Sequence, residues 1–406
     1  MYIYRHIEKI IKEQSKMFGA ILVTGSRQTG KTTMLKKITS PLPYITLDDP
    51  IMMQAANDEA GNFFKNTAPP VFIDEIQYAP SLFPYMKMII DEKREKGLFY
   101  LSGSQHFHMM KNVSESLAGR IGIINLSGLS LRERYGADFH DFFVPTEKYL
   151  SERGKNLTNP GYIEIWKAIH RGAMPELVAN EHISWHNYYA NYVKTYIERD
   201  VRDLTQVGDE LAFLRFLTVI AGMTGNILNL AAVSKDVGIS APTAERWLSI
   251  LTTTDIVFLL QPFHNNIFKR AIKTPKIYFY DTGLAAFLTK WSSSEVLESG
   301  AKAGAFFETF VISEIIKSFR NAGYDPPLYY YRDRDGKEID LLIHMDGTLY
   351  PLEIKRTSNP RKEDIRSFNT IENIPDMKRG PGGIICMYDK IISFNANDRV
   401  IPVSYI

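Results

Sequence analysis

The chain has 406 residues, too many for one ordinary domain, and this length favours two to four domains. Hydrophobic residues make up 45% and charged residues 23%, so the chain can bury substantial cores and is not a disordered protein. Its 48 Lys and Arg nearly balance its 46 Asp and Glu, so any affinity for nucleic acid must come from local patches. The single cysteine, Cys386, excludes a disulfide framework and a zinc site built on cysteines.

The chain contains no run of about 18 apolar residues, so we expect no membrane-spanning helix and no membrane partner. The N-terminal sequence MYIYRHIEKIIKEQ mixes charges with apolar residues at helical spacing, unlike the apolar core of a signal peptide. We therefore expect a cytoplasmic protein, and a reducing compartment suits the lone cysteine.

The first block of the chain alternates between strand and helix patterns. Residues 1–18 predict an amphipathic helix. Short apolar runs with the composition of buried strands follow at 21–25, 44–48, 71–75, 98–104 and 121–126. Helical segments separate these runs, which predicts an α/β fold with a parallel sheet covered by helices on both faces. We assign residues 1–144 to this domain.

The later blocks differ in pattern. Helical patterns dominate after residue 145, and we assign 145–210 to a helical lid. Residues 211–290 form a region that resembles a winged helix-turn-helix, in which Ser240 and Pro242 mark the start of the second helix. Residues 291–406 return to an α/β pattern and form the last predicted domain.

The strongest motif follows the first predicted strand. Its residues, Gly25, Ser26, Arg27, Gln28, Thr29, Gly30, Lys31 and Thr32, fit the pattern G-x-x-x-x-G-K-[ST], and Thr33 follows them in the helix. In such a loop, backbone N–H groups surround a phosphate and the helix N-terminus adds a positive dipole end. Lys31 would neutralise the β- and γ-phosphates, and the Thr32 hydroxyl would ligate Mg²⁺. The motif predicts a site for ATP and Mg²⁺.

Two acids end the predicted strand VFIDE. Asp74 would hold Mg²⁺ and its water ligands, and Glu75 would polarise the attacking water. A second acid favours hydrolysis over simple nucleotide storage. Two ordinary acids at a strand end are the alternative.

Two further polar residues complete the predicted ATP site. The segment LSGSQ places a small polar side chain near the γ-phosphate, and we favour Ser104 over Ser102, with a plain Ser/Gly turn as the alternative. Arg120 ends the segment SESLAGR and would point away from its own phosphate site. It could reach a neighbouring subunit as an arginine finger, so that hydrolysis requires assembly. A local ion pair is the alternative for Arg120.

The segments GSRQTGKTT, FIDEIQ, LSGSQ and LAGR resemble, in this order, those of the predicted AAA+-superfamily ATPases of bacteria and archaea. GAMPEL (172–177), YFYDTGLAAFL (278–288) and YPLEIKRTSNP (350–360) extend the resemblance over almost the whole chain. The resemblance implies a P-loop ATPase core, a helical lid with a winged helix, a C-terminal restriction-endonuclease-like domain and a homo-oligomer, with a hexamer as the default. The chain departs from the family at Gly128, where proline is more usual.

Four charged residues of the last block form a second candidate site. Glu308 lies on a predicted helix, Asp340 starts a strand, and Glu353 and Lys355 share one face of the next strand. This pattern resembles the PD-(D/E)xK nuclease core. Asp340 and Glu353 would hold Mg²⁺, with Mn²⁺ as a substitute, while Lys355 would orient the attacking water and Glu308 would bind metal or water. A fold kept only for structure or binding is the alternative.

Basic residues near the predicted winged helix indicate contacts with duplex or branched DNA. Thr243 and Arg246 lie on the presumed recognition helix, and Lys269, Arg270, Lys273 and Lys276 follow it. A role as a lid or a protein-contact module is the alternative for this region.

We therefore expect an ATP-hydrolysing AAA+ protein that acts on DNA and carries a Mg²⁺-dependent nuclease domain. The alternative is a regulatory or signalling ATPase whose C-terminal domain binds DNA or a protein partner without cutting.

Overall fold

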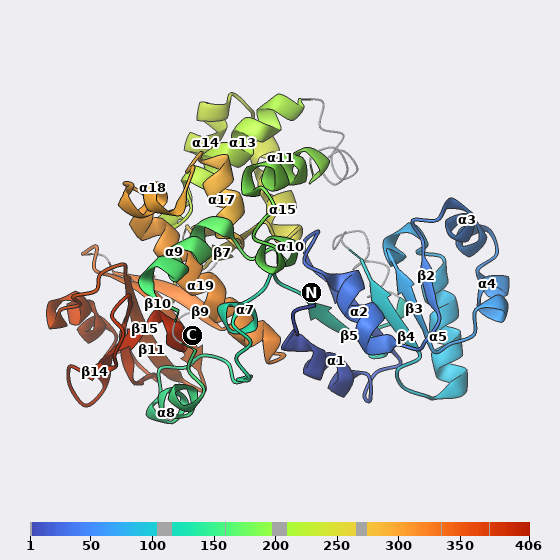
Figure 1. Cartoon of the computed structure of the whole chain (residues 1–406), viewed down its shortest axis with the longest axis horizontal. Coiled ribbons are helices and arrows are strands. Elements are labelled where there is room, and N and C mark those ends of the chain that lie inside the picture. Colours follow the sequence, from blue (N-terminus) through green and yellow to red (C-terminus); the bar gives the residue numbers. More distant parts are fainter. Residues whose placement is uncertain are drawn as a thin grey trace.

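The computed structural model describes residues 2–103, 116–158, 160–196, 209–264, 274–333, 335–372 and 374–406. Of the predicted site residues, Ser104, Lys269 and Arg270 lie outside these ranges, as does Lys273. The chain forms a first lobe from its N-terminal residues and a larger lobe from the residues after about 130 (Figure 1). Within the described residues, no helix combines the length and apolar character needed to cross a membrane.

The first lobe is a parallel sheet with the strand order β2-β3-β4-β1-β5. Its strands are β1 (Ala20–Thr24), β2 (Tyr44–Thr46), β3 (Val71–Asp74), β4 (Phe99–Ser102) and β5 (Ile121–Asn125). Its helices are α1 (Ile7–Gln14), α2 (Lys31–Thr39), α3 (Pro50–Asp58), α4 (Ala60–Asn66), the 3-10 turn η1 (Ile76–Tyr78) and α5 (Leu82–Lys93).

Both faces of this sheet are buried. Along β1, Ala20 and Leu22 pack into one hydrophobic cluster with α4 and α5, whereas Ile21 and Val23 pack into another with α1 and α2. This alternation follows from the two-residue period of a strand. The predicted α/β fold with a covered parallel sheet is confirmed.

The larger lobe begins with helices. They are α7 (Leu131–Arg134), α8 (Glu147–Lys155), α9 (Tyr162–Arg171), α10 (Pro175–Ala179), α11 (Trp185–Tyr196), α13 (Glu210–Gly222), α14 (Leu230–Val237), α15 (Ala241–Thr253), α17 (Thr282–Leu288), α18 (Ser294–Ser299) and α19 (Ala303–Asn321). A small antiparallel sheet with the order β6-β8-β7 accompanies α13 to α15, and its strands are β6 (Asn226–Ile227), β7 (Val257–Leu260) and β8 (Lys276–Phe279). Helix α15 begins as predicted, with Ser240 as its N-cap and Pro242 in its first turn.

A mixed sheet completes the larger lobe, with the order β14-β15-β13-β11-β10-β9 and β12 paired to β11. Its strands are β9 (Leu328–Arg332), β10 (Glu338–Met345), β11 (Thr348–Lys355), β12 (Lys378–Arg379), β13 (Gly382–Cys386), β14 (Ile392–Ser393) and β15 (Asp398–Pro402). The 3-10 turns η3 (Lys362–Ile371) and η4 (Val403–Tyr405) belong to the same part of the chain.

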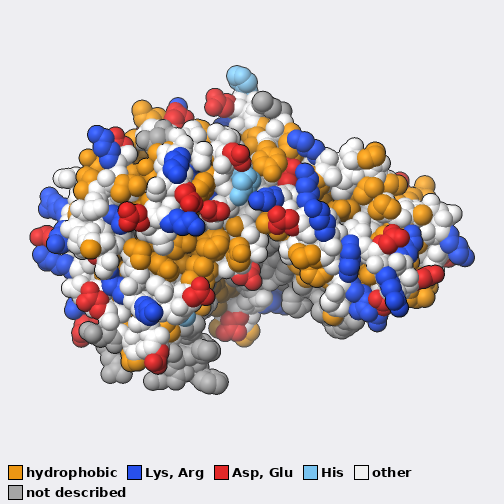
Figure 2. Space-filling model, turned by 90° about the horizontal axis from the view of Figure 1, so that it is seen from below, with side chains coloured by type: hydrophobic (Ala, Val, Ile, Leu, Met, Phe, Trp, Pro, Cys, Tyr) orange, Lys and Arg blue, Asp and Glu red, His pale blue; other side chains and the backbone are white. Residues whose placement is uncertain are grey.

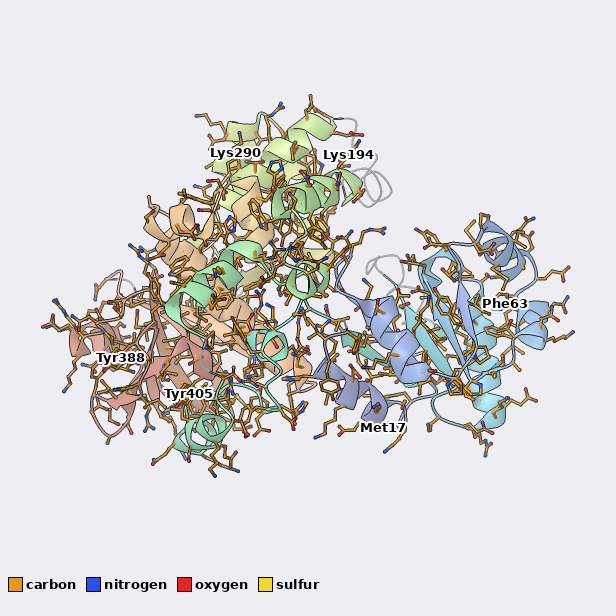
Figure 3. All side chains as sticks on the ribbon, in the orientation of Figure 1. Met17, Phe63, Lys194, Lys290, Tyr388 and Tyr405 are labelled. Atoms are coloured by element: carbon orange, nitrogen blue, oxygen red, sulfur yellow. The ribbon has the colours of Figure 1, made fainter. Side chains whose placement is uncertain are left out.

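One hydrophobic cluster runs through the larger lobe, from Leu131 on α7 to Ile406 at the C-terminus. A second cluster, which includes Ile339, Leu342 and Ile365, packs η3 against the mixed sheet. Helix α19 lies at the centre of the first cluster, with 15 of its 19 residues buried. The last residues pack against α8, where the Tyr149 hydroxyl donates to the carbonyl oxygen of Tyr405 at 2.8 Å (Figure 3). The first of these clusters contains residues of all three later predicted domains, together with Leu131, Phe139 and Phe143 of the first predicted domain.

Candidate functional site

The predicted P-loop connects the end of β1 to the first residue of α2. Gly25 and Gly30 have φ values of 133° and 89°, which favour glycine. A Cβ atom on Gly25 would also collide with the carbonyl oxygen of Leu126. Lys31 Nζ donates to the carbonyl oxygens of Gly25 at 2.9 Å and Ser26 at 2.8 Å. The loop therefore holds the ammonium group where phosphates would approach.

The two residues predicted to hold Mg²⁺ lie together. The Thr32 hydroxyl donates to Asp74 Oδ1 at 3.1 Å, and the Tyr44 hydroxyl donates to Asp74 Oδ2 at 3.2 Å. The hydroxyl of buried Ser102 also donates to Asp74 Oδ1. A hydroxyl and a carboxylate at this separation suit a shared Mg²⁺, whose preferred ligands are oxygen atoms.

The contact between Ser102 and Asp74 is a result of the strand order. Because β4 lies between β1 and β3, its last residue, Ser102, reaches the edge of the sheet between the P-loop and Asp74. The sequence pattern favours Ser104 for this place, and the structure shows that Ser102 contacts the site. No sequence pattern marks Tyr44.

Glu75 lies at the turn after β3, with a φ of 56°. It lines the same cavity as the P-loop, and the Gln77 side-chain amide donates to its Oε2 atom. The carboxylate therefore lies where an attacking water could contact it.

A cavity of about 1040 Å³ lies between the two lobes over the P-loop. P-loop residues from Arg27 to Thr33 line one side of it. Tyr2, Ile3 and Arg5 line it from the N-terminal segment, and Pro175, Glu176, Ala179 and Thr195 line it from α10 and α11. Its size is that of a site for a molecule as large as a nucleotide.

Arg5 is a residue of this site that no sequence pattern marked. It donates to the carbonyl oxygens of Thr29 at 2.9 Å and Ser127 at 2.7 Å, and it forms an ion pair with Glu133 at 3.1 Å. Burial by itself raises the pKa of Glu133, but attraction to Arg5 and His6 and two backbone hydrogen bonds outweigh it and lower the pKa. This buried ion pair connects the P-loop to the start of the larger lobe.

Two segments that carry the family resemblance meet in the larger lobe. Asp281 Oδ2 accepts a hydrogen bond from the backbone N–H of Ala173 at 2.7 Å, and Asp281 Oδ1 accepts one from the Tyr189 hydroxyl at 2.7 Å. A Cβ atom on Gly172 would collide with both side chains, and its φ is 82°. The segments GAMPEL and YFYDTGLAAFL therefore fix α10 beside the P-loop cavity.

Arg120 directly precedes β5, whereas the P-loop directly follows β1, which is parallel to β5. The two therefore lie at opposite ends of the strands of this sheet. The Arg120 guanidinium group forms two hydrogen bonds to Asp91 on α5, at 2.6 and 2.9 Å. Both side chains are partly exposed. The single chain thus shows the local ion pair that is the alternative to an arginine finger, on a face that a second subunit could reach.

The four charged residues of the predicted nuclease site come together. Lys355 Nζ lies 3.1 Å from Asp340 Oδ2 and 2.8 Å from Glu353 Oε2. The backbone N–H of Ile354 donates to Asp340 Oδ2 at 2.9 Å. Glu308 approaches the same group from α19, close enough for the Asp340 charge to raise the pKa of its carboxyl group.

Burial sets the ionisation of these acids. It raises the pKa of Glu353 to about 8 and that of Glu308 to about 7, and in both cases the Asp340 charge adds to the rise. Burial also acts to raise the pKa of Asp340, but attraction to Lys355 and Lys276 outweighs it and the pKa falls below its ordinary value. Asp340 is therefore the acid of this site that holds its charge most firmly.

The Lys355 ammonium group lies where a metal cation would bind, so its contacts indicate whether a cation fits this site. One positive charge contacts both Asp340 and Glu353, so a divalent cation placed there could bind both carboxylates. Within the described ranges, no group of three or more His, Cys, Asp or Glu side chains is arranged to hold a metal ion. A cation bound by these two carboxylates would need water molecules and a phosphate as its other ligands.

The helix-turn-helix residues lie on the surface but carry little net charge. Arg246 is exposed on α15, and the Thr243 hydroxyl contacts the Ser240 hydroxyl at 2.8 Å. Lys235 and Arg246 are the two cations of α14 and α15, and Asp236 and Glu245 are their two anions. Figure 2 shows the molecule from below, the side away from α14 in Figure 1, and over much of that face Lys and Arg also lie among Asp and Glu.

The prediction that Lys276 tracks a duplex is not supported. Its side chain is 5% exposed and is paired with Glu308 and Glu338, because β8 lies against the C-terminal acidic site. Lys276 and Tyr278, two residues later, are therefore further candidates for the C-terminal site, and the sequence analysis did not assign either of them to it.

Three models of known protein families match parts of the chain. The model of an AAA domain matches residues 18–135. Models of two domains of unknown function, DUF8612 and DUF4143, match residues 163–295 and 303–406. Together with the P-loop and the Thr32–Asp74 contact, the first match defines an AAA-type P-loop ATPase, and the predicted ATPase class is confirmed.

Two whole-chain relatives define the family more narrowly. Over 342 residues the chain is 30% identical to Uncharacterized protein Rv2008c of Mycobacterium tuberculosis and to Uncharacterized protein Mb2031c of Mycobacterium bovis. The match covers 84% of this chain and 71% of each relative. The chain belongs to the same family as these mycobacterial proteins.

The similarity of this chain to solved structures is weaker. The Walker-type ATPase PABY2304 of Pyrococcus abyssi has a TM-score of 0.44 at 14% identity, covering 70% of this chain and 94% of that chain. The RuvB Holliday junction branch migration motor of Thermotoga maritima has a TM-score of 0.27 at 17% identity, covering 62% of this chain and 85% of that chain. These scores are too low to assign a role.

Proposed function

We propose that this protein hydrolyses ATP with Mg²⁺ at the P-loop cavity and uses the nucleotide to control a metal-dependent nuclease that acts on DNA. The observation that carries the proposal is that one chain gathers two sets of residues suited to phosphate chemistry. Thr32, Asp74 and Glu75 form the first set around the P-loop cavity. Asp340, Glu353 and Lys355 form the second set.

At the first site, each residue has a role in phosphoryl transfer. Lys31 would bind the β- and γ-phosphates, and Thr32 and Asp74 would hold Mg²⁺, which offsets the charge of the transferred group. Glu75 would orient the attacking water. The lid residues that line the cavity from α10 and α11 would exclude bulk water.

At the second site, Asp340 and Glu353 would hold the divalent cation, which acts as a Lewis acid on the scissile phosphate. Lys355 would then leave the two carboxylates and orient the attacking water. Glu308 would accept a hydrogen bond from that water or bind the cation.

Helix α19 supports coupling between the two sites. It carries Glu308 at the acidic site, and further along it contacts the segment that leaves the ATPase sheet. The backbone N–H of Leu131 donates to Glu314 Oε2 at 2.6 Å, and Lys317 Nζ donates to the carbonyl oxygen of Leu129 at 3.2 Å. A movement of this segment would therefore act directly on the helix that holds Glu308.

The proposal is tested by incubating the full-length protein with plasmid, linear and four-way DNA, Mg²⁺ or Mn²⁺, and ATP. Cleavage of one form, together with ATP turnover stimulated by the same form, is the expected result. Absence of cleavage of every form with both cations contradicts the nuclease half of the proposal.

A second candidate function is that of a regulatory ATPase with a protein partner. The balanced charge of α14 and α15 favours it, because phosphate contacts depend on clustered cations. A duplex-binding helix-turn-helix gives an affinity that falls steeply with salt. A lack of salt-dependent DNA affinity, with ATPase activity intact, favours the protein partner.

We predict that Arg120→Ala abolishes ATP hydrolysis and leaves ATP binding nearly intact, because the proposed finger acts on a neighbouring subunit of a homo-oligomer. Steady-state turnover and nucleotide affinity measure the two effects. Asp91→Ala is the matched control, since it breaks the same ion pair and keeps the arginine. Equal loss of turnover in both variants means that only the local ion pair matters.

We also predict that Mn²⁺ affinity at the C-terminal site rises from about pH 6 to about pH 9. Glu353, with a pKa of about 8, is protonated at the acidic end of this range and must lose its proton to bind a cation. Electron paramagnetic resonance of free Mn²⁺ measures the affinity, with Asp340→Asn as the baseline. A flat pH profile contradicts the assignment of Glu353 as a ligand.

A further inference from the structure

Strand β8 of the helix-turn-helix region brings two side chains into the C-terminal acidic site. Lys276 Nζ lies 3.3 Å from Glu308 Oε1 and 2.5 Å from Glu338 Oε1. The Tyr278 hydroxyl donates to the same Glu308 oxygen at 2.6 Å. Since the Lys276 side chain is 5% exposed, its charge is part of the site and not of the surface.

The position of β8 is tied to the C-terminal sheet. β8 pairs with β7, and the chain after β7 forms a parallel bridge between Pro262 and Tyr330 on the edge strand β9. The backbone N–H of Phe263 donates to the carbonyl oxygen of Tyr330 at 2.6 Å, and the Tyr330 hydroxyl donates to that of Thr274 at 2.6 Å. The small sheet of the helix-turn-helix region is therefore joined to the edge of the C-terminal sheet.

The charges of the site come from three parts of the chain. The carboxylates of Glu308, Glu338, Asp340 and Glu353 face two ammonium groups. Lys355 belongs to the nuclease-like strand motif and its side chain is 39% exposed, so it can swing aside. The Lys276 side chain is more deeply buried and comes from a different element, β8. Lys276 is paired with Glu308 and Glu338, and its charge also acts on Asp340. A cation bound by Asp340 would therefore be repelled by Lys276.

We propose that Lys276 is a positioning residue of the acidic site: it supplies a resident positive charge, and with Tyr278 it holds Glu308 in place. This inference rests on the proposed nuclease function. It means that the position of the helix-turn-helix region sets both the cation affinity of the site and the orientation of Glu308. Loss of the Lys276 charge then tightens cation binding, while loss of its hold on Glu308 slows cleavage.

The test compares Mn²⁺ binding by nucleotide-free, full-length variants, measured by electron paramagnetic resonance. Lys276→Met is expected to bind Mn²⁺ about tenfold more tightly than wild type and to cleave DNA more slowly. Lys276→Arg keeps the charge and is expected to bind Mn²⁺ as wild type does. Arg379→Met is the matched control, because its cation is also largely buried and is paired with an acid, Asp398. Arg379 pairs with Leu349, four residues along β11 from Glu353 and therefore about 13 Å away, and its replacement should not change Mn²⁺ affinity.

Equal Mn²⁺ affinity in Lys276→Met and Arg379→Met overturns the inference and leaves the metal site intact. Wild-type protein that binds no more Mn²⁺ than Asp340→Asn instead overturns the proposed metal site, and the inference with it. If Lys276→Met does not fold, Tyr278→Phe removes one bond to Glu308 and keeps every charge. Slower cleavage at unchanged Mn²⁺ affinity then supports the inference, and unchanged cleavage overturns it.

Discussion

Replacement of Glu75 by glutamine is expected to lower ATP turnover by about 100-fold or more, while ATP affinity stays within about threefold of wild type. The amide keeps the size of the side chain but cannot polarise the attacking water as a carboxylate does. Lys31, Thr32 and Asp74 continue to hold the nucleotide and Mg²⁺. Phosphate release measures turnover, and a fluorescent ATP analogue measures affinity.

Two further variants make this result specific. Glu92→Gln makes the same chemical change at an exposed position of α5, outside the P-loop cavity, and should leave turnover unchanged. Lys31→Ala should lose ATP binding as well as turnover, because it removes the charge that faces the phosphates. Turnover of Glu75→Gln close to that of wild type would show that another group orients the water.

The second large effect is expected at the C-terminal site, where Asp340→Asn should reduce DNA cleavage by about 100-fold or more, since loss of a residue that only orients a metal ligand already costs about 10- to 100-fold. Asp340 is the acid with the lowered pKa and contacts both Lys355 and the backbone of β11. The amide removes the charge that a cation needs. Cleavage of plasmid DNA and Mn²⁺ affinity are the measurements.

Asp346→Asn is the matched control for this experiment. Asp346 lies in the exposed turn that joins β10 to β11, six residues from Asp340, with a φ of 49° that asparagine tolerates. This variant should cleave as wild type does. ATP turnover should also be unchanged in Asp340→Asn, so that loss of cleavage cannot be ascribed to the first lobe. Equal cleavage by wild type and Asp340→Asn contradicts the nuclease assignment.

The parts of the ATP site that are close in sequence could be predicted well. The P-loop is one contiguous segment whose glycines are needed for local backbone reasons, and Asp74 and Glu75 end a strand that its apolar run marks. The choice between Ser102 and Ser104 depends on which residue ends β4 beside β3. Arg5 contacts the P-loop and Glu133 from a distant part of the chain, and no local pattern records such a contact.

The residues of the acidic site could also be predicted only where they follow a local pattern. Glu353 and Lys355 share a face because of the strand period, and a family pattern links them to Asp340 and Glu308. Lys276 looks like one more surface cation in sequence, because a lysine in a basic segment is usually exposed. Its burial depends on the contact of the small sheet with β9, which forms between segments far apart in the chain.

By itself, the sequence determined the ATPase class, the phosphate-binding loop and the identity of the acids that gather in the last block, because each depends on short-range spacing and strand or helix period. Only the tertiary structure decided that residues of all the later regions pack into one cluster, that Ser102 contacts Asp74, and that Lys276 enters the acidic site. These outcomes depend on which distant surfaces bury one another, and the free energy of that packing is not a property of any one segment.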